Sequence, residues 1–533
     1  MNKRLKLNNI DFSLIPMLLL SCIIGTITGA LVWSFKFVAR FIKNETIIIY
    51  TYVDSNPIFI PILFLGLVLI AFIIAFIIKI DPDVKGGGVP RSEGILRGLI
   101  TFRWLRLFIG TIFSSLLGFL GGLPLGTEGP SVILGLAIGK GTSTTTMLHS
   151  KPAMNRYLMT SGASAGFAVA TSAPLAGIVF VLEEIHKRFS FIILMVVMSG
   201  ILFATIASSY LNEICGLTSL YFEMGDIKSL PFDYIWLVLI IGVLSGFLAV
   251  LFNQLMFSTG KFFEIKLAKV PRVVKLIATF TLVGISGLLM INSVGGGDRL
   301  IINLSNTENI WYLILILLVV KMFLIAISAN SGATGGLFVP VIILGGIFGV
   351  LLNCIFTKFG MDASYTKAVL CFSMCAFLGA TMHAPLTAVI FIIEATGNFD
   401  GTLLLITAVF TAVMITNFFS VESLNDVILN KTLRQQDKDK KVNLFEVTGC
   451  VEEKAFLIGK SARDILWPAN CIIKTMIRKG QVSSDAKMVK GGDKIFKTGD
   501  CIIIQTQTYD INQTEIELKE LLGEQTFTRK SLN

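Results

Sequence analysis

Charged residues are scarce in this sequence. Only 15% of its 533 residues are Asp, Glu, Lys or Arg, against about 25% in an ordinary soluble protein, while 54% are hydrophobic and the mean hydropathy is +0.77. This scarcity excludes a water-soluble globular protein. Because several apolar segments have the length of roughly 20 residues that a bilayer crossing requires, a single membrane anchor is also excluded. These segments are Leu14–Leu31, Ile58–Ile78, Leu107–Leu123, Phe191–Ala207, Tyr234–Phe252, Leu276–Ile291, Trp311–Ile327 and Leu403–Phe419.

Histidine is scarcer still, with three residues, and the eight cysteines are scattered without a C-x-x-C pair. Neither a zinc site nor a disulfide framework is indicated, and we expect no metal and no cofactor. Cys371 and Cys375 are expected to pack between helices. No cleavable signal peptide follows the basic start at residues 1–6, which favours a cytoplasmic N-terminus.

The net charge of +10 does not indicate a nucleic-acid partner. Its Lys and Arg residues are spread over loops, which is typical of juxtamembrane segments. Examples are Arg91–Arg106, His186–Arg188 and Lys261–Lys275.

An internal repeat is the most informative pattern in the chain. Residues 130–139 (PSVILGLAIG) recur as residues 340–349 (PVIILGGIFG), an offset of 210 (340 − 130). Residues 173–183 and 384–394 share an APL motif, a Phe and a final Glu at an offset of 211 (394 − 183). Two blocks at one spacing predict duplicated halves, at about residues 10–215 and 230–435.

In each half a glycine-rich, proline-interrupted loop leads into a short apolar stretch, at Gly126–Gly139 and at Gly332–Gly349. We interpret these stretches as half-helices that start inside the membrane. In transporters built from repeated halves, such paired segments mark a binding site near the midplane. Glycine and proline can also simply kink closely packed helices, but their matched positions favour half-helices.

A helix that starts inside a bilayer presents unpaired N–H groups and the positive end of its dipole. Such a helix start attracts anions, glycines allow the backbone to approach the ion, and prolines suit the first turn. The sequence therefore predicts an anion site made mostly of backbone amides, which bind moderately enough for the ion to leave. The relevant residues are Gly86, Gly87, Gly88, Gly126, Gly129, Gly335, Gly336, Pro90, Pro130 and Pro340.

Glu128 heads the first half-helix, and an ionisable side chain inside a membrane is by default a functional candidate. Its carboxylate could occupy the anion site when ionised and leave it when protonated, so that one residue gates and carries a proton. The alternative is a permanent cap of the helix N-terminus. Glu183 and Glu184 end an apolar run just before basic residues, and taken alone they indicate a solvated helix end paired with Lys or Arg.

Three motifs together resemble those of the ClC family of chloride channels and chloride/proton antiporters. Residues 86–90 (GGGVP) resemble the family's GSGIP loop, residues 126–130 (GTEGP) its GREGP, and residues 336–340 (GLFVP) its GxFxP. The resemblance covers about residues 10–435. It implies an all-α polytopic membrane protein with the ClC-type inverted-repeat fold, broken half-helices, and a homodimer with one anion pathway per subunit.

The resemblance also implies residue roles. Glu128 falls on the external gating glutamate that accepts a proton, and Glu184 on the internal proton glutamate that marks exchangers. Glu93 falls on a carboxylate close to Glu184 that supports this relay. Amides of Thr127, Gly129, Leu337, Phe338 and Val339 would line the outer anion site, and Gly86, Gly87 and Gly88 the inner one.

This sequence departs from the family pattern at three of these positions. Gly87 stands where a serine usually faces the central ion, and Thr127 where arginine is usual. Asn425 aligns with the central tyrosine, so we expect it among the anion-binding residues. Because the serine influences anion choice and the tyrosine narrows the inner side, the sequence leaves open chloride against nitrate and the tightness of coupling.

The composition changes after residue 435. Residues 436–441 form a charged linker, and strand-like runs follow at Val442–Val447, Cys471–Ile477 and Cys501–Thr506. The pattern over residues 442–523 resembles the C-terminal domain of Trk-type potassium-uptake regulators. It implies a small α+β cytoplasmic domain, residues 442–533, that either senses a small ligand such as a cyclic dinucleotide or only dimerises.

We therefore expect a proton-coupled chloride exchanger of the cell membrane with both termini in the cytoplasm, and with chloride, protons and the lipid bilayer as partners. A passive anion channel is the main alternative. A potassium transporter is a distant one, because the chain has no T-V-G-Y-G-like filter. We do not expect an enzyme, since Gly295–Asp298 lacks the strand-loop-helix setting of a nucleotide site.

Overall fold

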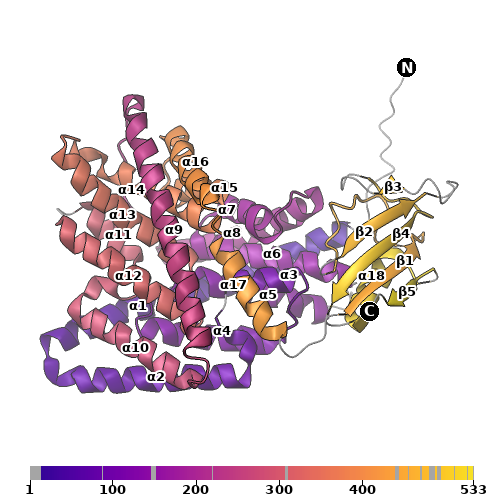
Figure 1. Cartoon of the computed structure of the whole chain (residues 1–533), viewed down its shortest axis with the longest axis horizontal. Coiled ribbons are helices and arrows are strands. Elements are labelled where there is room, and N and C mark those ends of the chain that lie inside the picture. Colours follow the sequence, from indigo (N-terminus) through magenta and orange to yellow (C-terminus); the bar gives the residue numbers. More distant parts are fainter. Residues whose placement is uncertain are drawn as a thin grey trace.

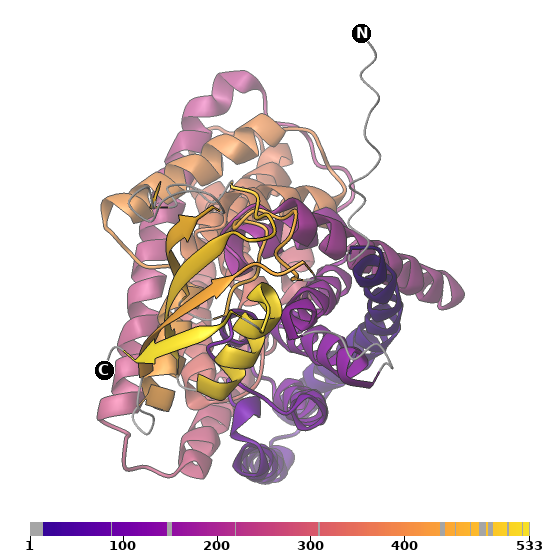
Figure 2. The same cartoon turned by 90° about the vertical axis from the view of Figure 1, so that its right-hand side faces the viewer.

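The computed structural model describes residues 14–86, 88–145, 152–218, 220–306, 310–437, 443–453, 455–468, 471–478, 487–488, 494–508, 511–524 and 526–531. Helices form the body of the molecule, and a small sheet domain lies at one end of it (Figure 1 and Figure 2). We call the end of the helical body that meets the sheet domain the tail face.

The helical body consists of seventeen α-helices among the described residues. A π-helical turn, η3 (Val181–Ile185), continues α7. In chain order they are α1 (Leu14–Ser55), α2 (Ile60–Ile80), α3 (Val89–Leu96), α4 (Trp104–Leu120), α5 (Glu128–Thr145), α6 (Pro152–Thr171), α7 (Pro174–Phe180), α8 (Phe191–Ile214), α9 (Ile235–Ile265), α10 (Arg272–Leu289), α11 (Asp298–Asn306), α12 (Trp311–Ser331), α13 (Phe338–Lys358), α14 (Thr366–Met382), α15 (Pro385–Thr396), α16 (Thr402–Phe418) and α17 (Leu424–Asp437).

The outer surface of this body is apolar. Large hydrophobic side chains of α2 stand out from the molecule, with Leu65 69% exposed and Phe76 63% exposed. A surface of this kind needs an apolar solvent. Eight helical segments among the described residues are long and apolar enough to cross a membrane, and three shorter apolar helices accompany them. The predicted polytopic, mostly helical architecture is confirmed, and each predicted apolar segment falls on a helix to within three residues.

The two halves of the repeat cap each other's helices. The carboxylate of Glu183 accepts hydrogen bonds from the N–H groups of the second and third residues of α15, at 3.1 and 2.8 Å. Glu394, its counterpart in the second half, accepts from the second and third residues of α7, at 2.9 and 2.8 Å. The equivalent residues Ser172 and His383 both have a left-handed backbone, with φ of 52° and 56°. These matched contacts agree with the repeat predicted from the 211-residue offset.

The predicted half-helices begin where expected and extend further than expected. α5 starts after a break at residues 121–127 and α13 after a break at residues 332–337. They have 18 and 21 residues, about 27 and 32 Å at 1.5 Å per residue. Gly139 and Gly349, the predicted ends, are packing positions: a Cβ there would lie 2.6 Å from the Leu158 carbonyl oxygen and 2.8 Å from the Leu370 Cα. These glycines let α5 pack on α6 and α13 on α14.

The tail folds into one antiparallel sheet of order β3-β2-β4-β1-β5 with helix α18 (Ile511–Leu522). All three predicted runs are strands of this sheet, while α18 and the two edge strands were not predicted. The strands are β1 (Asn443–Cys450), β2 (Ile472–Ile477), β3 (Lys487–Met488), β4 (Cys501–Thr508) and β5 (Thr528–Ser531).

The cysteines correct one expectation. Cys450 and Cys501 are directly opposite each other on β1 and β4 and form a disulfide. Their separation of 51 residues gives no local signal, because only the register of the two strands brings them together.

The sheet domain is fixed to the tail face by buried polar contacts. Arg156, near the start of α6, is 6% exposed and forms an ion pair with Glu517 of α18. Ser190, just before α8, donates to the carboxylate of Asp464 at 2.8 Å. Arg188 donates to the carbonyl oxygen of Ile465 at 3.0 Å. The sheet domain therefore holds the link that joins η3 to α8.

Candidate functional site

Three loops, far apart in the sequence, meet at the centre of the helical body. The N–H of Gly126 donates to the carbonyl of Gly336 at 2.9 Å, and the N–H of Gly336 donates back at 2.8 Å. A Cβ on Gly129 would lie 2.8 Å from the Cα atoms of both Gly88 and Gly336. Only glycine permits backbones to approach this closely. The three motifs singled out in the sequence therefore lie against one another.

The start of α13 is held in place by aromatic rings from both halves. Phe338, its first residue, makes edge contacts with Phe167 at 5.0 Å, Phe391 at 5.2 Å and Phe180 at 6.2 Å between ring centroids. Offset and edge-on arrangements of this kind are favourable. The first N–H groups of α5 and α13 have no partner inside their own helices. Such helix starts, fixed and buried, are suited to binding an anion.

Glu128 lies at this meeting point. It is 0% exposed, and its carboxylate is folded back over the loop, since a Cβ on Gly126 would lie 2.0 Å from its Oε2. The same oxygen would be 2.8 Å from a Cβ on Gly336, and the hydroxyl of Thr127 is 3.4 Å from Oε1. The carboxylate thus lies against the backbone of both helix starts.

A second buried carboxylate belongs to Glu184, in η3. It is 2% exposed and accepts a hydrogen bond from the side-chain amide of Asn425 at 2.8 Å. Asn425, at the start of α17, is itself buried. Its amide is therefore committed to the carboxylate of Glu184, and the expected contact of Asn425 with an anion stays a prediction.

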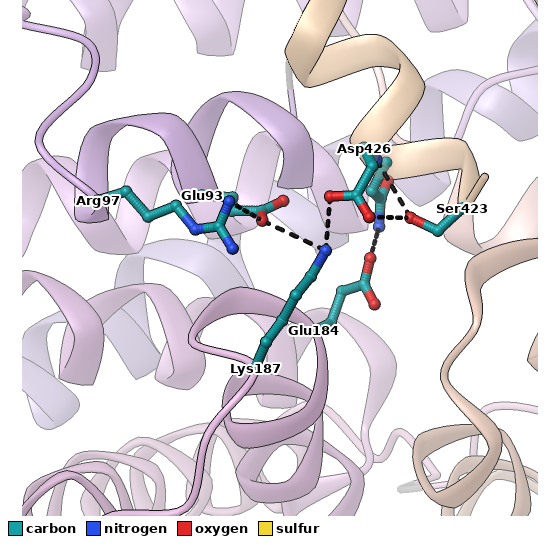
Figure 3. A network of polar contacts seen from close by, with 7 residues as sticks. Glu93, Arg97, Glu184, Lys187, Ser423 and Asp426 are labelled. Atoms are coloured by element: carbon teal, nitrogen blue, oxygen red, sulfur yellow. Dashed lines mark hydrogen bonds and ion pairs between the residues drawn. The ribbon is translucent and has the colours of Figure 1, made fainter. Parts of the chain in front are cut away.

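Charged groups from three elements surround Glu184 (Figure 3). Glu93, on α3, is 0% exposed and lies 3.1 Å from the guanidinium of Arg97 and 3.7 Å from the ammonium of Lys187. The same ammonium lies 2.5 Å from the carboxylate of Asp426 on α17, which the hydroxyl of Ser423 contacts at 2.9 Å. We call Glu93, Arg97, Glu184, Lys187 and Asp426 the inner carboxylate cluster.

The predicted site residues thus fall into two groups. Gly88, Thr127, Glu128, Gly129, Leu337, Phe338 and Val339 lie where α3, α5 and α13 begin. Glu93, Glu184 and Asn425 belong to the second group, in and beside the inner carboxylate cluster. Gly86 lies in the loop before α3, where its N–H donates to the Gly332 carbonyl at 3.1 Å. Gly87 lies outside the described residues.

Comparison with known proteins identifies the family of this chain. The sequence profile described as voltage gated chloride channel matches residues 66–417. The chain belongs to this family. The H(+)/Cl(-) exchange transporter ClcA of Yersinia pseudotuberculosis serotype IB (strain PB1/+) is 31% identical over 445 residues, which is 81% of this chain and 91% of that protein. ClcA of Citrobacter koseri is 30% identical over 444 residues, 80% of this chain and 91% of its own.

The fold of this ClC-family chain matches solved structures as well. A slow cyanobacterial Cl-/H+ antiporter superposes with a TM-score of 0.72 at 26% identity, covering 79% of this chain and 99% of the antiporter. The region matched by the family profile contains all three glycine loops, Glu128 and Glu184, whereas Asn425, Asp426 and the sheet domain lie after it.

Sequence reasoning missed three members of the inner carboxylate cluster. Arg97 and Lys187 stand in basic runs that are typical of juxtamembrane loops, and Asp426 lies next to Asn425 without a recognised motif. The signal for Lys187 was its place three residues after Glu184 in the sequence. No comparable signal marks Asp426, because its contact with Lys187 spans 239 residues.

Proposed function

We propose that this chain exchanges chloride for protons across a membrane. The family assignment and the relatives named as exchange transporters support the proposal. The observation that carries it is Glu128, a fully buried carboxylate folded over the paired loops where α5 and α13 begin. A charge buried at helix starts, which themselves favour anions, competes with any small anion for that place.

This competition provides a mechanism. When Glu128 is ionised, its carboxylate occupies the helix starts and excludes chloride. When it takes up a proton it loses its charge, the amides and dipole ends no longer favour it, and chloride can enter. Each cycle of chloride entry and exit therefore switches the Glu128 side chain between its charged and its neutral form. The same side chain gates the anion and carries the proton.

Protons must also reach Glu128 from the opposite side. Glu184 supplies a second buried carboxylate, in the same cluster as Glu93 (Figure 3). In our proposal Glu184 receives protons from the cytoplasm and Glu93 supports it. The anion follows the backbone amides of residues 86–88 at the inner site, of Thr127 and Gly129, and of residues 337–339.

Reconstitution into liposomes tests the proposal against a passive anion channel. With the membrane potential clamped, chloride leaving the vesicles should drive protons inward against an opposing pH gradient. A channel would dissipate its chloride gradient without moving protons uphill. Vesicles that pass potassium but no halide would exclude both. Repeating the measurement with nitrate and fluoride determines the anion preference that Gly87 and Asn425 leave open.

The glycine contact at the centre gives a further prediction. Gly129→Ala should lower chloride flux by about tenfold, because its Cβ would lie 2.8 Å from the Cα atoms of Gly88 and Gly336 and such overpacking costs about 1–3 kcal/mol. Gly66→Ala on α2 is the matched control, since a Cβ there meets nothing within 4 Å. Equal flux from both variants in liposomes would contradict the close-packed site.

Three finer features belong to the same proposal. The protein acts as a homodimer, with the exposed side chains of Leu175 on α7 and Leu386 on α15 in its interface. Both termini face the cytoplasm, so that the tail face is cytoplasmic. The sheet domain senses a small ligand, such as a cyclic dinucleotide, or serves only to dimerise. Its contacts with Arg156, Arg188 and Ser190 support an influence on transport.

A further inference from the structure

The link between η3 and α8 contains a lysine with an unusual backbone. Lys187 has φ of 50°, in the left-handed region that residues other than glycine rarely adopt. It lies two residues after the end of η3, a π-helical turn, and such turns are frequent at functional sites. The Lys187 side chain extends toward α3 and α17 and reaches the carboxylates there (Figure 3).

The ammonium of Lys187 lies between two carboxylates. It is 2.5 Å from Asp426 and 3.7 Å from Glu93. The Glu93 side chain is 0% exposed, while those of Lys187 and Asp426 are 33% and 34% exposed. Lys187 therefore connects a buried carboxylate on α3 with a half-exposed one on α17, and the next residue along the chain, Arg188, is held by the sheet domain.

The inner carboxylate cluster has more acids than bases. Glu93, Glu184 and Asp426 are three carboxylates, whereas Lys187 and Arg97 are two cations. His383, at the end of α14, lies within electrostatic reach of Lys187 and Asp426. Three nearby carboxylates repel one another when all are ionised, and a cation in contact with a carboxylate favours its charged form. One of the three is therefore expected to take up a proton, and contact with the cations decides which one.

The three carboxylates differ in whether their partners are cations. Glu93 contacts both Arg97 and Lys187, and Asp426 contacts Lys187 and the hydroxyl of Ser423. Glu184, in contrast, is hydrogen-bonded to the neutral amide of Asn425.

We propose that Lys187 is a positioning residue of the proton pathway, which neutralises Glu93 and Asp426 and thereby directs the incoming proton to Glu184. The proton passes from water at the tail face to a Glu184 carboxylate oxygen, and Lys187 keeps its own charge throughout. This inference rests on the proposed exchange function, because it assigns a role within the proton half of that exchange.

Charge removal at Lys187 tests the inference in liposomes that contain the full-length protein. Lys187→Met keeps most of the side-chain stem and removes the ammonium, so Asp426 and Glu93 become competing proton acceptors. We expect chloride-driven proton flux to fall about tenfold, since a contacting opposite charge shifts proton affinity by at least about that factor. Chloride flux should stay within about twofold. Lys187→Arg should behave as the wild type, and Lys269→Met, at an exposed lysine, is the matched control.

A double variant separates this role from a purely structural one. Lys187→Met combined with Asp426→Asn removes a competing carboxylate along with the ammonium, and should recover at least half of the lost proton flux. Three results would overturn the inference. Lys187→Met could lower chloride and proton flux equally, or leave proton flux unchanged. The double variant could also show no more proton flux than Lys187→Met alone. If the wild type itself shows no chloride-driven proton flux, the proposed function fails first. If the wild type exchanges and Lys187→Met exchanges equally well, only the role of Lys187 fails.

Discussion

Replacing Glu184 by alanine is expected to lower chloride-driven proton flux by about 100-fold, the lower end of what a positioned proton-transfer group contributes, while chloride flux continues. The reason is the separation of the two groups of site residues. Glu184 lies in η3, hydrogen-bonded to Asn425, whereas the paired loops that would hold the anion are formed by Gly126 and Gly336. Its loss interrupts the proton supply and leaves the amides of the helix starts in place.

The measurement records chloride efflux and internal pH in the same vesicles. Glu422→Ala is a suitable control, because it removes an exposed carboxylate that lies close in the sequence to Ser423. Glu184→Gln keeps the size and hydrogen-bonding capacity of the side chain, and should lose proton flux as fully as Glu184→Ala. Proton transport at the wild-type level in either variant would remove Glu184 from the pathway.

The features that could be predicted from the sequence are those that repeat or that recur within short motifs. Glu183 and Glu394 could be matched because the repeat places each at the same point of its half, although their reciprocal capping of α15 and α7 is visible only in three dimensions. The loops around Gly88, Gly129 and Gly336 could be grouped because each combines glycine with a nearby helix-starting proline. In these cases the residues that meet a chemical requirement are close to one another in the sequence.

What could not be predicted depends on long-range packing. Lys187 and Asp426 are 239 residues apart in the sequence, and neither carries a motif that points to the other. The disulfide between Cys450 and Cys501 depends on the strand register of β1 and β4. The ends of α5 and α13 were misjudged because glycine serves both to end helices and to let them pack closely. These two uses of glycine can be distinguished only when the neighbouring helix is known.

Replacing Glu128 by glutamine is expected to abolish proton coupling and to make chloride flux independent of pH. In the wild type, a lower pH protonates more of the Glu128 side chains and frees the helix starts, so chloride flux should rise as the pH falls, by up to about tenfold per unit where the group titrates. Glutamine has nearly the same shape as the protonated acid and cannot ionise. The variant should therefore show a constant flux close to the wild-type value at low pH, together with no chloride-driven proton movement.

The alternative role of Glu128, a permanent cap of α5, leads to the opposite expectation. A cap stabilises the helix start through the charge of its carboxylate, so its replacement by glutamine would weaken folding and leave any pH dependence of transport unaltered. Chloride efflux measured between pH 4.5 and 7.5, on protein whose thermal unfolding is measured in parallel, distinguishes the two. The buried position of the Glu128 carboxylate over Gly126 and Gly336 favours the gate, since a cap would not need to lie across the place where both helix starts meet.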